Sequence, residues 1–407
     1  MNMNRWVAVF LVVLVAIGVA LWVTFFPTPH FPQPTGPHPI GTKVFQWTDV
    51  TRPEPFTADS EDRRRLTIQV WYPANTPGTL QPYIDQPAIT AALAERLHLP
   101  AFVFRNIQNA PTHAVTDAQP AQGRFPVLIN PTGFSGFRNA NLFWIEHLVS
   151  HGYVVVGMDQ PGTAAATVLE NGAVIPLMAS KADFDRYMPM SLSDNGAASP
   201  SLNGVNLPGG IIPYLAQDMS FVLDQIGLNF PSTVDPNRAG IFGMSLGGYI
   251  AAHSCLVDER FRACLAVDSG HTRDVVKQGL TQPLAIISRD ADVMRREREA
   301  AGGWSEAEIA HTVDSQRALF SNNRGDAFYL SMNQMFHINW TDAPIWTPII
   351  GWFGLSGPVD PYRGFAETNA FTLAFFDRYL RPDPSITLSA PDGSLLETKI
   401  AGSARSQ

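Results

Sequence analysis

A Gly-x-Ser-x-Gly pentapeptide lies between an apolar run and a helix-like run in the middle of this chain. It is GMSLG, residues 243–247, within the segment GIFGMSLGGYIAAH at 240–253. A strand that turns sharply into a helix at a serine needs small residues two positions before and after it, because the turn brings neighbouring backbone close. Ser245 is therefore a candidate nucleophile. The alternative is an ordinary serine in a glycine-rich bend, so the rest of the chain must supply a base, an acid and an oxyanion site.

Apolar runs of strand length alternate with helical periods along the chain. In IPYLAQDMSFVLDQIG, apolar residues repeat on one helical face, and Ser305 with Glu308 forms a capping box before another helix. A final helix is expected at 365–380. The predicted strands are 66–73, 125–130, 151–159, 238–243, 262–268, 283–288 and 326–332. This alternation predicts an α/β fold with a mostly parallel central sheet and helices on both faces.

The chain is long enough for one large domain with additional segments. We expect a targeting segment at 1–26, a proline-rich spacer leading into the domain at 27–60, a catalytic domain at 61–380 and a C-terminal tail at 381–407. Residues 163–213 are rich in Gly, Pro, Ser and Asn. A long insertion of this kind is typical of lids and substrate loops.

The N-terminal segment predicts contact with a membrane. Arg5 precedes the uncharged run 6–26, which is long enough to cross a bilayer. This length exceeds the apolar core of a signal peptide and favours an uncleaved signal anchor, although Gly18-Val19-Ala20 offers a cleavage site. Either way, the domain is expected outside the cytoplasm, anchored or secreted.

Composition excludes several other classes of function. The net charge is −8 and no basic run occurs, so nucleic acid is not an expected partner. The two cysteines, Cys255 and Cys264, lie in apolar stretches without metal-ligand spacing. We therefore expect buried free thiols and neither a metal nor a cofactor. The oligomeric state does not follow from the sequence.

Four of the ten histidines follow Ser245, which matters because an α/β-hydrolase orders its triad as serine, acid, histidine. His253 lies on the helix that the serine begins, and cannot fold back onto it. His271 is close to a candidate acid, and His311 belongs to the capped helix, where a surface position is expected. His337 follows the strand at 326–332 and has the position of a catalytic base.

Two places compete for the acid. Asp268 ends the first strand after the serine, whereas Asp290 and Asp292 follow the next strand, the more usual location in this fold. Either carboxylate could instead be a strand-end residue or a solvated turn residue. The residues alone do not choose between them.

The chain resembles a known family over 34–380. It is similar to the secreted type of platelet-activating factor acetylhydrolase and its bacterial α/β-hydrolase relatives. The segments that carry the likeness are PTGPHPIGT, RLTIQVWYPA, FPVLINPTGFSGFR, SHGYVVVGMDQPGTAAAT, GMSLGGY, DERFRACLAVD and FHINWTD.

The resemblance assigns roles to individual residues. It implies that Asp268, in the A-x-D position, is the acid, with Asp292 as the alternative. It also implies an oxyanion hole made by the backbone N–H groups of Phe134 and Leu246. The family has His-Gly where this chain has Thr132-Gly133, which changes the groups that support this hole.

These observations lead to one hypothesis with two alternatives. The chain is expected to hydrolyse short-chain or phospholipid-type carboxylic esters through Ser245, His337 and Asp268, by way of an acyl-enzyme. A general carboxylesterase or polyester hydrolase would use the same residues. A non-catalytic binding domain of the same fold is the alternative from another class.

A second apolar segment, APIWTPIIGWFGL at 343–355, begins six residues after His337 and carries no charge. It is too short to span a bilayer. Trp346, Trp352 and their neighbours either pack into the core or form an apolar rim at the headgroup level of a membrane.

Overall fold

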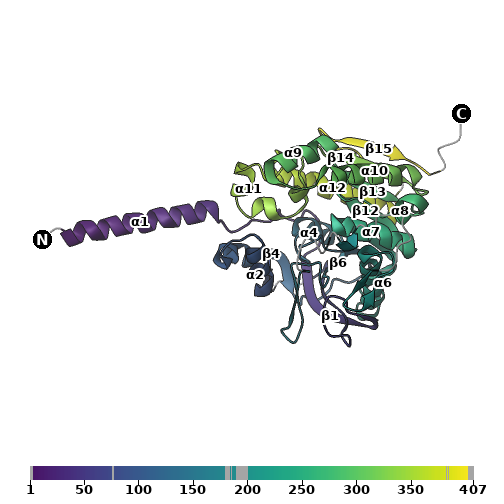
Figure 1. Cartoon of the computed structure of the whole chain (residues 1–407), viewed down its shortest axis with the longest axis horizontal. Coiled ribbons are helices and arrows are strands. Elements are labelled where there is room, and N and C mark those ends of the chain that lie inside the picture. The colour runs from purple at the N-terminus through teal and green to yellow at the C-terminus, as the bar shows by residue number, and fades with distance from the viewer. Residues whose placement is uncertain are drawn as a thin grey trace.

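A computed structural model describes residues 3–75, 78–178, 184, 186–188, 200–381, 383 and 385–401. Figure 1 shows helix α1 (Met3–Phe25) projecting away from the remaining elements, which pack together into one body. This arrangement separates the apolar N-terminal run from the rest of the chain.

Eleven strands of the described residues form one sheet, in the order β15-β14-β13-β12-β11-β5-β6-β2-β1-β4-β3. The strands from β6 to β14 in this order are parallel, and β15 and β2 pair antiparallel to them at either side. Two short hairpins lie outside this sheet. The bounds are β1 (Ile40–Pro53), β2 (Arg63–Pro73), β3 (Leu80–Pro82), β4 (Pro111–Thr116), β5 (Phe125–Asn130), β6 (Val154–Asp159), β7 (Ala166–Val168), β8 (Val174–Pro176), β9 (Ser201–Leu202), β10 (Val205–Asn206), β11 (Val234–Met244), β12 (Phe261–Val267), β13 (Leu284–Ser288), β14 (Ala327–Ser331) and β15 (Leu395–Lys399).

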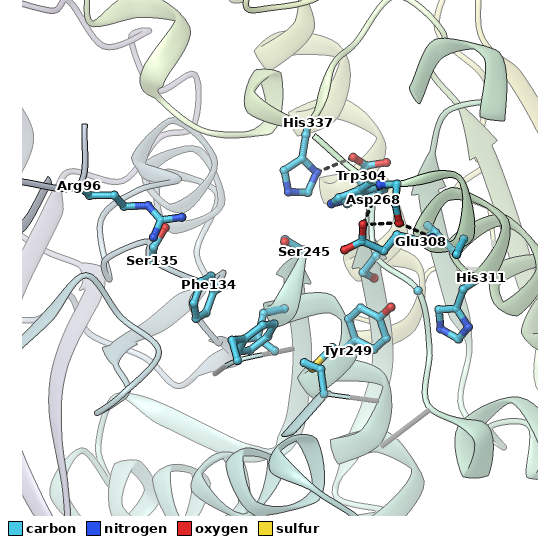
Figure 2. Close-up of a pocket in the computed structure, with 18 residues that line it drawn as sticks. Arg96, Phe134, Ser135, Ser245, Tyr249, Asp268, Trp304, Glu308, His311 and His337 are labelled. Atoms are coloured by element: carbon cyan, nitrogen blue, oxygen red, sulfur yellow. Dashed lines mark hydrogen bonds and ion pairs between the residues drawn. The ribbon is translucent and has the colours of Figure 1, made fainter. Parts of the chain in front are cut away.

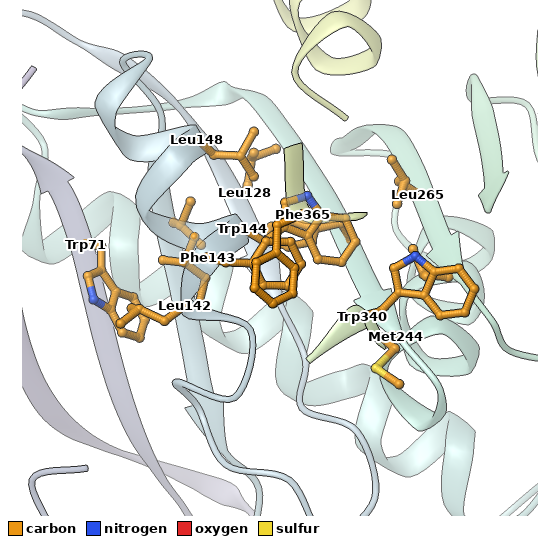
Figure 3. Close-up of a cluster of buried hydrophobic side chains, with 14 of the residues drawn as sticks. Trp71, Leu128, Leu142, Phe143, Trp144, Leu148, Met244, Leu265, Trp340 and Phe365 are labelled. Carbon is orange, nitrogen blue, oxygen red and sulfur yellow. The ribbon is translucent and has the colours of Figure 1, made fainter. Parts of the chain in front are cut away.

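Helices cover both faces of the sheet and create two apolar cores. One core packs α4 (Leu142–Ser150) and α12 (Pro361–Leu380) against the sheet, and it includes the stacked rings that Figure 3 shows around Trp144 and Phe365. The other packs α6 (Ile211–Asn229) and α7 (Leu246–Val257). The remaining helices are α2 (Pro87–Arg96), η1 (Ala101–Phe104), α3 (Arg105–Gln108), α8 (Arg273–Gln278), α9 (Ala291–Ala301), α10 (Glu306–Asn322), η2 (His337–Trp340), η3 (Ala343–Ile345) and α11 (Ile349–Trp352).

The predicted α/β architecture is confirmed, including the seven predicted strands and the capping box of α10. The apolar helical face is also confirmed, because its members are all buried in the second core: Leu215, Met219, Val222, Leu223 and Ile226. Cys255 and Cys264 are buried free thiols, as expected.

Two expected segment boundaries differ from the structure. The sheet begins at Ile40, because β1 pairs with β2 over its length, so the domain starts before residue 61. Leu395–Lys399, expected to belong to a tail, forms β15 at the sheet edge. The insertion at 163–213 contains β7 to β10, while 179–183, 185 and 189–199 lie outside the described residues.

The proline-rich segment also packs on the domain instead of extending freely. Phe31 is buried with its ring 4.7 Å from that of Tyr83. The His38 N–H donates to the Ser150 carbonyl at 3.0 Å, and the Tyr362 hydroxyl donates to the His30 carbonyl at 2.8 Å. The end of α1 is therefore joined to the domain by an ordered segment.

Candidate active site

Ser245 occupies a strained turn between β11 and α7. Its φ is 58° and its ψ is −127°, a left-handed conformation that residues other than glycine rarely adopt. A Cβ on Gly243 would lie 2.3 Å from the Gly247 carbonyl oxygen, and a Cβ on Gly247 would lie 2.3 Å from the Pro131 carbonyl oxygen. Only glycine fits at these two positions, so the pentapeptide forms a sharp elbow that presents the serine hydroxyl.

His337 and Asp268 form a hydrogen-bonded pair beside this elbow. The Nδ1 atom of His337 lies 2.6 Å from Oδ2 of Asp268, and the aspartate is fully buried. Figure 2 shows the Ser245 side chain pointing into the pocket toward the His337 ring. The three residues follow β11, β12 and β14, whose carboxyl ends meet at one edge because these strands are parallel.

A buried guanidinium also binds this carboxylate. Nε of Arg289 lies 3.1 Å from both Asp268 oxygens, and its Nη2 lies 3.1 Å from Oδ2. Burial raises the pKa of Asp268, but the charge of Arg289 and the hydrogen bond from His337 lower it, so the net pKa is below the ordinary value. Asp268 is held as a carboxylate.

Glu297 on α9 links Arg289 to the histidine loop. It accepts the backbone N–H of His337 at 3.1 Å through Oε1, and its Oε2 pairs with Nη1 of Arg289. Trp304 packs edge-on to the His337 ring at 5.0 Å, with Arg289 on its face at 5.6 Å. His337 is thus held by hydrogen bonds to Asp268 and Glu297 and by contact with the Trp304 ring.

The other candidate acids lie away from His337. Asp292 is 88% exposed in the first turn of α9 and pairs with Arg295 at 2.7 Å. Asp290 hydrogen bonds to Asn333 at 2.6 Å. Of the two expected positions for the acid, the structure places Asp268 on the imidazole and Asp292 in solvent.

The loop after β5 lies directly beside the serine. A Cβ on Gly133 would lie 3.7 Å from Cβ of Ser245. Among the described residues, the backbone N–H groups of Phe134 and Leu246 have no hydrogen-bond acceptor. Thr132, where the family has histidine, donates its hydroxyl to the Met158 carbonyl. Two free amides therefore adjoin the Ser245 side chain, one in the loop after β5 and one at the start of α7, and Thr132 binds the first of these segments to β6.

These groups open into a cavity of about 730 Å³. One wall is apolar and includes Phe134, Phe184 and Leu246, whereas the other carries polar groups from α10. Its lining residues are Arg96, Phe134, Ser135, Phe184, Met188, Ser245, Leu246, Tyr249, Asp268, Ser269, Gly270, Trp304, Ser305, Ala307, Glu308, His311, Thr312 and His337. His311, expected at the surface, is half-buried and lines this cavity.

The remaining histidines do not contact Asp268. His253 is buried in α7, 3.3 Å from the Thr272 hydroxyl. Burial lowers the pKa of His271 to about 3, and neither ring nitrogen has a partner among the described residues. Within the described residues, no group of three or more His, Cys, Asp or Glu side chains has the arrangement of a metal site.

Comparison with known proteins supports the architecture. No protein-family model and no curated protein matches the chain. A solved structure of a ferulic acid esterase from Streptomyces cinnamoneus is similar, with a TM-score of 0.70 and 24% sequence identity, over 91% of this chain and 99% of that one. The chain has the α/β-hydrolase fold. The likeness to platelet-activating factor acetylhydrolases rests on the sequence motifs alone.

Sequence reasoning missed Arg289, Glu297 and Trp304. Arg289 directly follows β13, so its position at a strand end was the available signal. Glu297 lies in the middle of the charged segment RREREA, where it looks like any solvated helix residue. Its role depends on how α9 packs, which the local pattern does not contain.

Proposed function

We propose that this protein is a serine hydrolase of carboxylic esters. The observation that carries the proposal is the strained Ser245 elbow, which shares one cavity with the hydrogen-bonded pair His337 and Asp268. A strained serine conformation is retained only where the surrounding structure enforces it, and such strain concentrates at functional sites.

Each group has a role in acyl transfer. His337 takes the Ser245 hydroxyl proton through Nε2 as Oγ attacks the ester carbonyl, and Asp268 fixes the imidazole tautomer and stabilises its cation. The amides of Phe134 and Leu246 hold the oxyanion. His337 then gives the proton to the departing alkoxide, and a water repeats the attack on the acyl-enzyme, which regenerates Ser245. This route uses neither a metal nor a cofactor.

Short-chain or phospholipid-type esters are the proposed substrates. The sequence likeness to platelet-activating factor acetylhydrolases and the apolar N-terminal helix support a lipid ester. A general carboxylesterase is the second candidate, because the aromatic residues Phe134, Tyr249 and Trp304 line a cavity that also suits other acyl groups, including aromatic ones.

The test combines a covalent probe with a substrate panel. A fluorophosphonate should label the full chain but not Ser245→Ala, which should remain folded and lose ester hydrolysis. A wild-type protein that neither reacts with the probe nor hydrolyses esters would favour the non-catalytic binding domain. Rates with p-nitrophenyl esters of increasing length, a short-chain phospholipid and methyl ferulate then separate the two substrate classes.

A further inference from the structure

The end of α1 touches exposed aromatic residues on two separate parts of the domain. The ring of Trp22 lies 5.6 Å from that of Phe102 in η1, and Phe25 lies 5.6 Å edge-on from Trp352 in α11. Phe102 and Trp352 are each 60% exposed and Phe353 is 70% exposed. We name Phe102, Trp352 and Phe353 the apolar collar, because they flank the point where α1 meets the domain.

Hydrogen bonds fix the same junction. The Thr347 hydroxyl donates to the Phe25 carbonyl and the Asn106 amide donates to the Phe26 carbonyl, each at 2.6 Å. Trp346 of the same apolar segment instead packs near Tyr83 and Phe137, with 6.3 Å between ring centroids in each pair. Trp346 therefore packs against the core, whereas Trp352 and Phe353 belong to the collar.

The length of α1 determines how deep the collar would lie in a membrane that this helix spans. Trp6–Phe25 has a mean hydropathy of 2.9 and none of it is buried in the domain. A helix of this length extends about 30 Å at ~1.5 Å per residue, which matches a hydrocarbon core of about 30 Å. If this helix stays in the bilayer, Phe25 ends at the membrane surface, and residues that touch it lie at the same depth.

We propose that the apolar collar is embedded in the headgroup region of the leaflet through which α1 emerges. Scattered exposed apolar side chains need no partner, but Phe102 and Trp352 contact the end of a membrane-length helix, and the exposed Phe353 directly follows Trp352. Aromatic residues are enriched at this boundary, where a ring is partly removed from water. The ordered segment after α1 then holds the domain in one orientation on the membrane.

This orientation brings one edge of the cavity toward the lipid. Arg96 lines the cavity at the end of α2, and Phe102 of the collar follows it by six residues. The exposed side chains of Leu97 and Leu99 lie between them in sequence. A lipid ester could therefore enter from the membrane without crossing water, a consequence that rests on the proposed hydrolase function.

The embedding is tested with fluorescent labels on the full chain in phosphatidylcholine nanodiscs. Both native cysteines are buried, so Phe353→Cys and Phe102→Cys provide reactive thiols. The control is Leu228→Cys, which is 73% exposed near the end of α6, a helix that Figure 1 shows on the side of the domain away from α1. We expect blue-shifted emission and quenching by headgroup-spin-labelled lipid at 353 and 102, but not at 228.

Three results would overturn the proposal. The labels at 353 and 102 could behave like the label at 228, or they could be protected in detergent as the protein concentration rises, which would indicate a second copy as occupant. Mass spectrometry of the membrane-purified chain could also show that residues 6–25 have been removed.

Activity provides an independent readout. Phe102→Ser with Phe353→Ser should slow hydrolysis of vesicle-held esters several-fold and leave a soluble p-nitrophenyl ester unchanged. The matched control is Leu228→Ser with Val257→Ser, since both side chains are exposed and apolar. A wild-type enzyme inactive on both esters would refute the hydrolase function, whereas the labels would still decide the embedding.

Discussion

The charges behind His337 should set the acidic limb of its pH–rate profile. Asp268, Glu297 and Arg289 form a buried cluster with a formal charge of −1. The total charge of this cluster together with His337 rises from −1 to zero when His337 takes up a proton in the transition state. The net negative charge of the cluster is therefore opposite in sign to the charge that develops on His337 in the transition state.

Removing one charge at a time should move the limb in opposite directions. In Arg289→Gln the cluster carries a charge of −2. The pair of His337 and Asp268 then takes up a proton more easily, and the limb moves to higher pH. Glu297→Gln leaves 0 and moves it to lower pH. The double variant restores −1, so its limb should lie close to that of the wild type.

The size of the shift follows from the geometry. Nη2 of Arg289 lies 3.1 Å, and Nδ1 of His337 lies 2.6 Å, from the same Asp268 oxygen. The two nitrogens are therefore within about 6 Å of each other, where unit charges interact by about 3 kcal/mol at an effective dielectric constant of 20. This corresponds to about 2 pH units before solvent screening. We expect a shift of about one unit after solvent screening.

The assay is kcat/KM for a soluble ester between pH 5 and 9, with unfolding measured in parallel. Arg289→Gln should also cost about 3 to 5 kcal/mol of stability, because it leaves buried carboxylates without their cation. The double variant should recover part of this cost. Limbs that move in the same direction, or do not move in any folded variant, would refute the electrostatic argument.

Three further predictions concern the acid, the elbow and a separate ion pair. Asp268→Asn should reduce kcat by orders of magnitude while Asp292→Asn stays near wild type, because only Asp268 contacts the imidazole; the reverse ranking in a kinetic assay would move the acid to β13. Gly247→Ala should lower soluble yield and melting temperature, since its Cβ meets the Pro131 carbonyl, whereas Gly351→Ala, with no atom within 4 Å, should not. The hydrogen bond to Glu146 raises the pKa of His113, so this pair stabilises the fold fully below pH ~6.5 and loses its effect as pH rises through the folded value. The free energy of unfolding, measured with urea between pH 5 and 9, should fall less steeply with rising pH in His113→Gln than in the wild type. Equal slopes would contradict the role of this pair.

Local patterns were sufficient for much of the fold. Strand runs, the capping box of α10 and the Ser245 elbow depend on residues close in sequence, and each is present in the structure. The order serine, acid, histidine left four of the ten histidines, and their positions on predicted helices and strands favoured His337. These features depend on which residues occupy turns and on the spacing of apolar residues, and both can be read from a single sequence.

Long-range packing accounts for what the sequence did not reveal. His311 looked exposed because α10 is polar on several sides, yet its side chain faces the cavity. β15 has the short, mixed pattern LLETK and becomes a strand only by pairing with β14. The collar likewise depends on η1 and α11 meeting at α1, although they are far apart in sequence.

The position of the proposed acid shows why strand register matters at this site. Val267 is level with Ile287 in the parallel pair of β12 and β13, so Asp268 lies next to Ser288, one residue before Arg289. The end of β13, where the acid is more usual in this fold, thus supplies a cation to a carboxylate on β12. An aspartate at the end of each strand looks equivalent in the sequence, but only one of them faces the guanidinium and the imidazole together. The choice between Asp268 and Asp292 therefore depends on register and on the buried Arg289, because the carboxylate that can orient His337 is the one whose charge is compensated in the core.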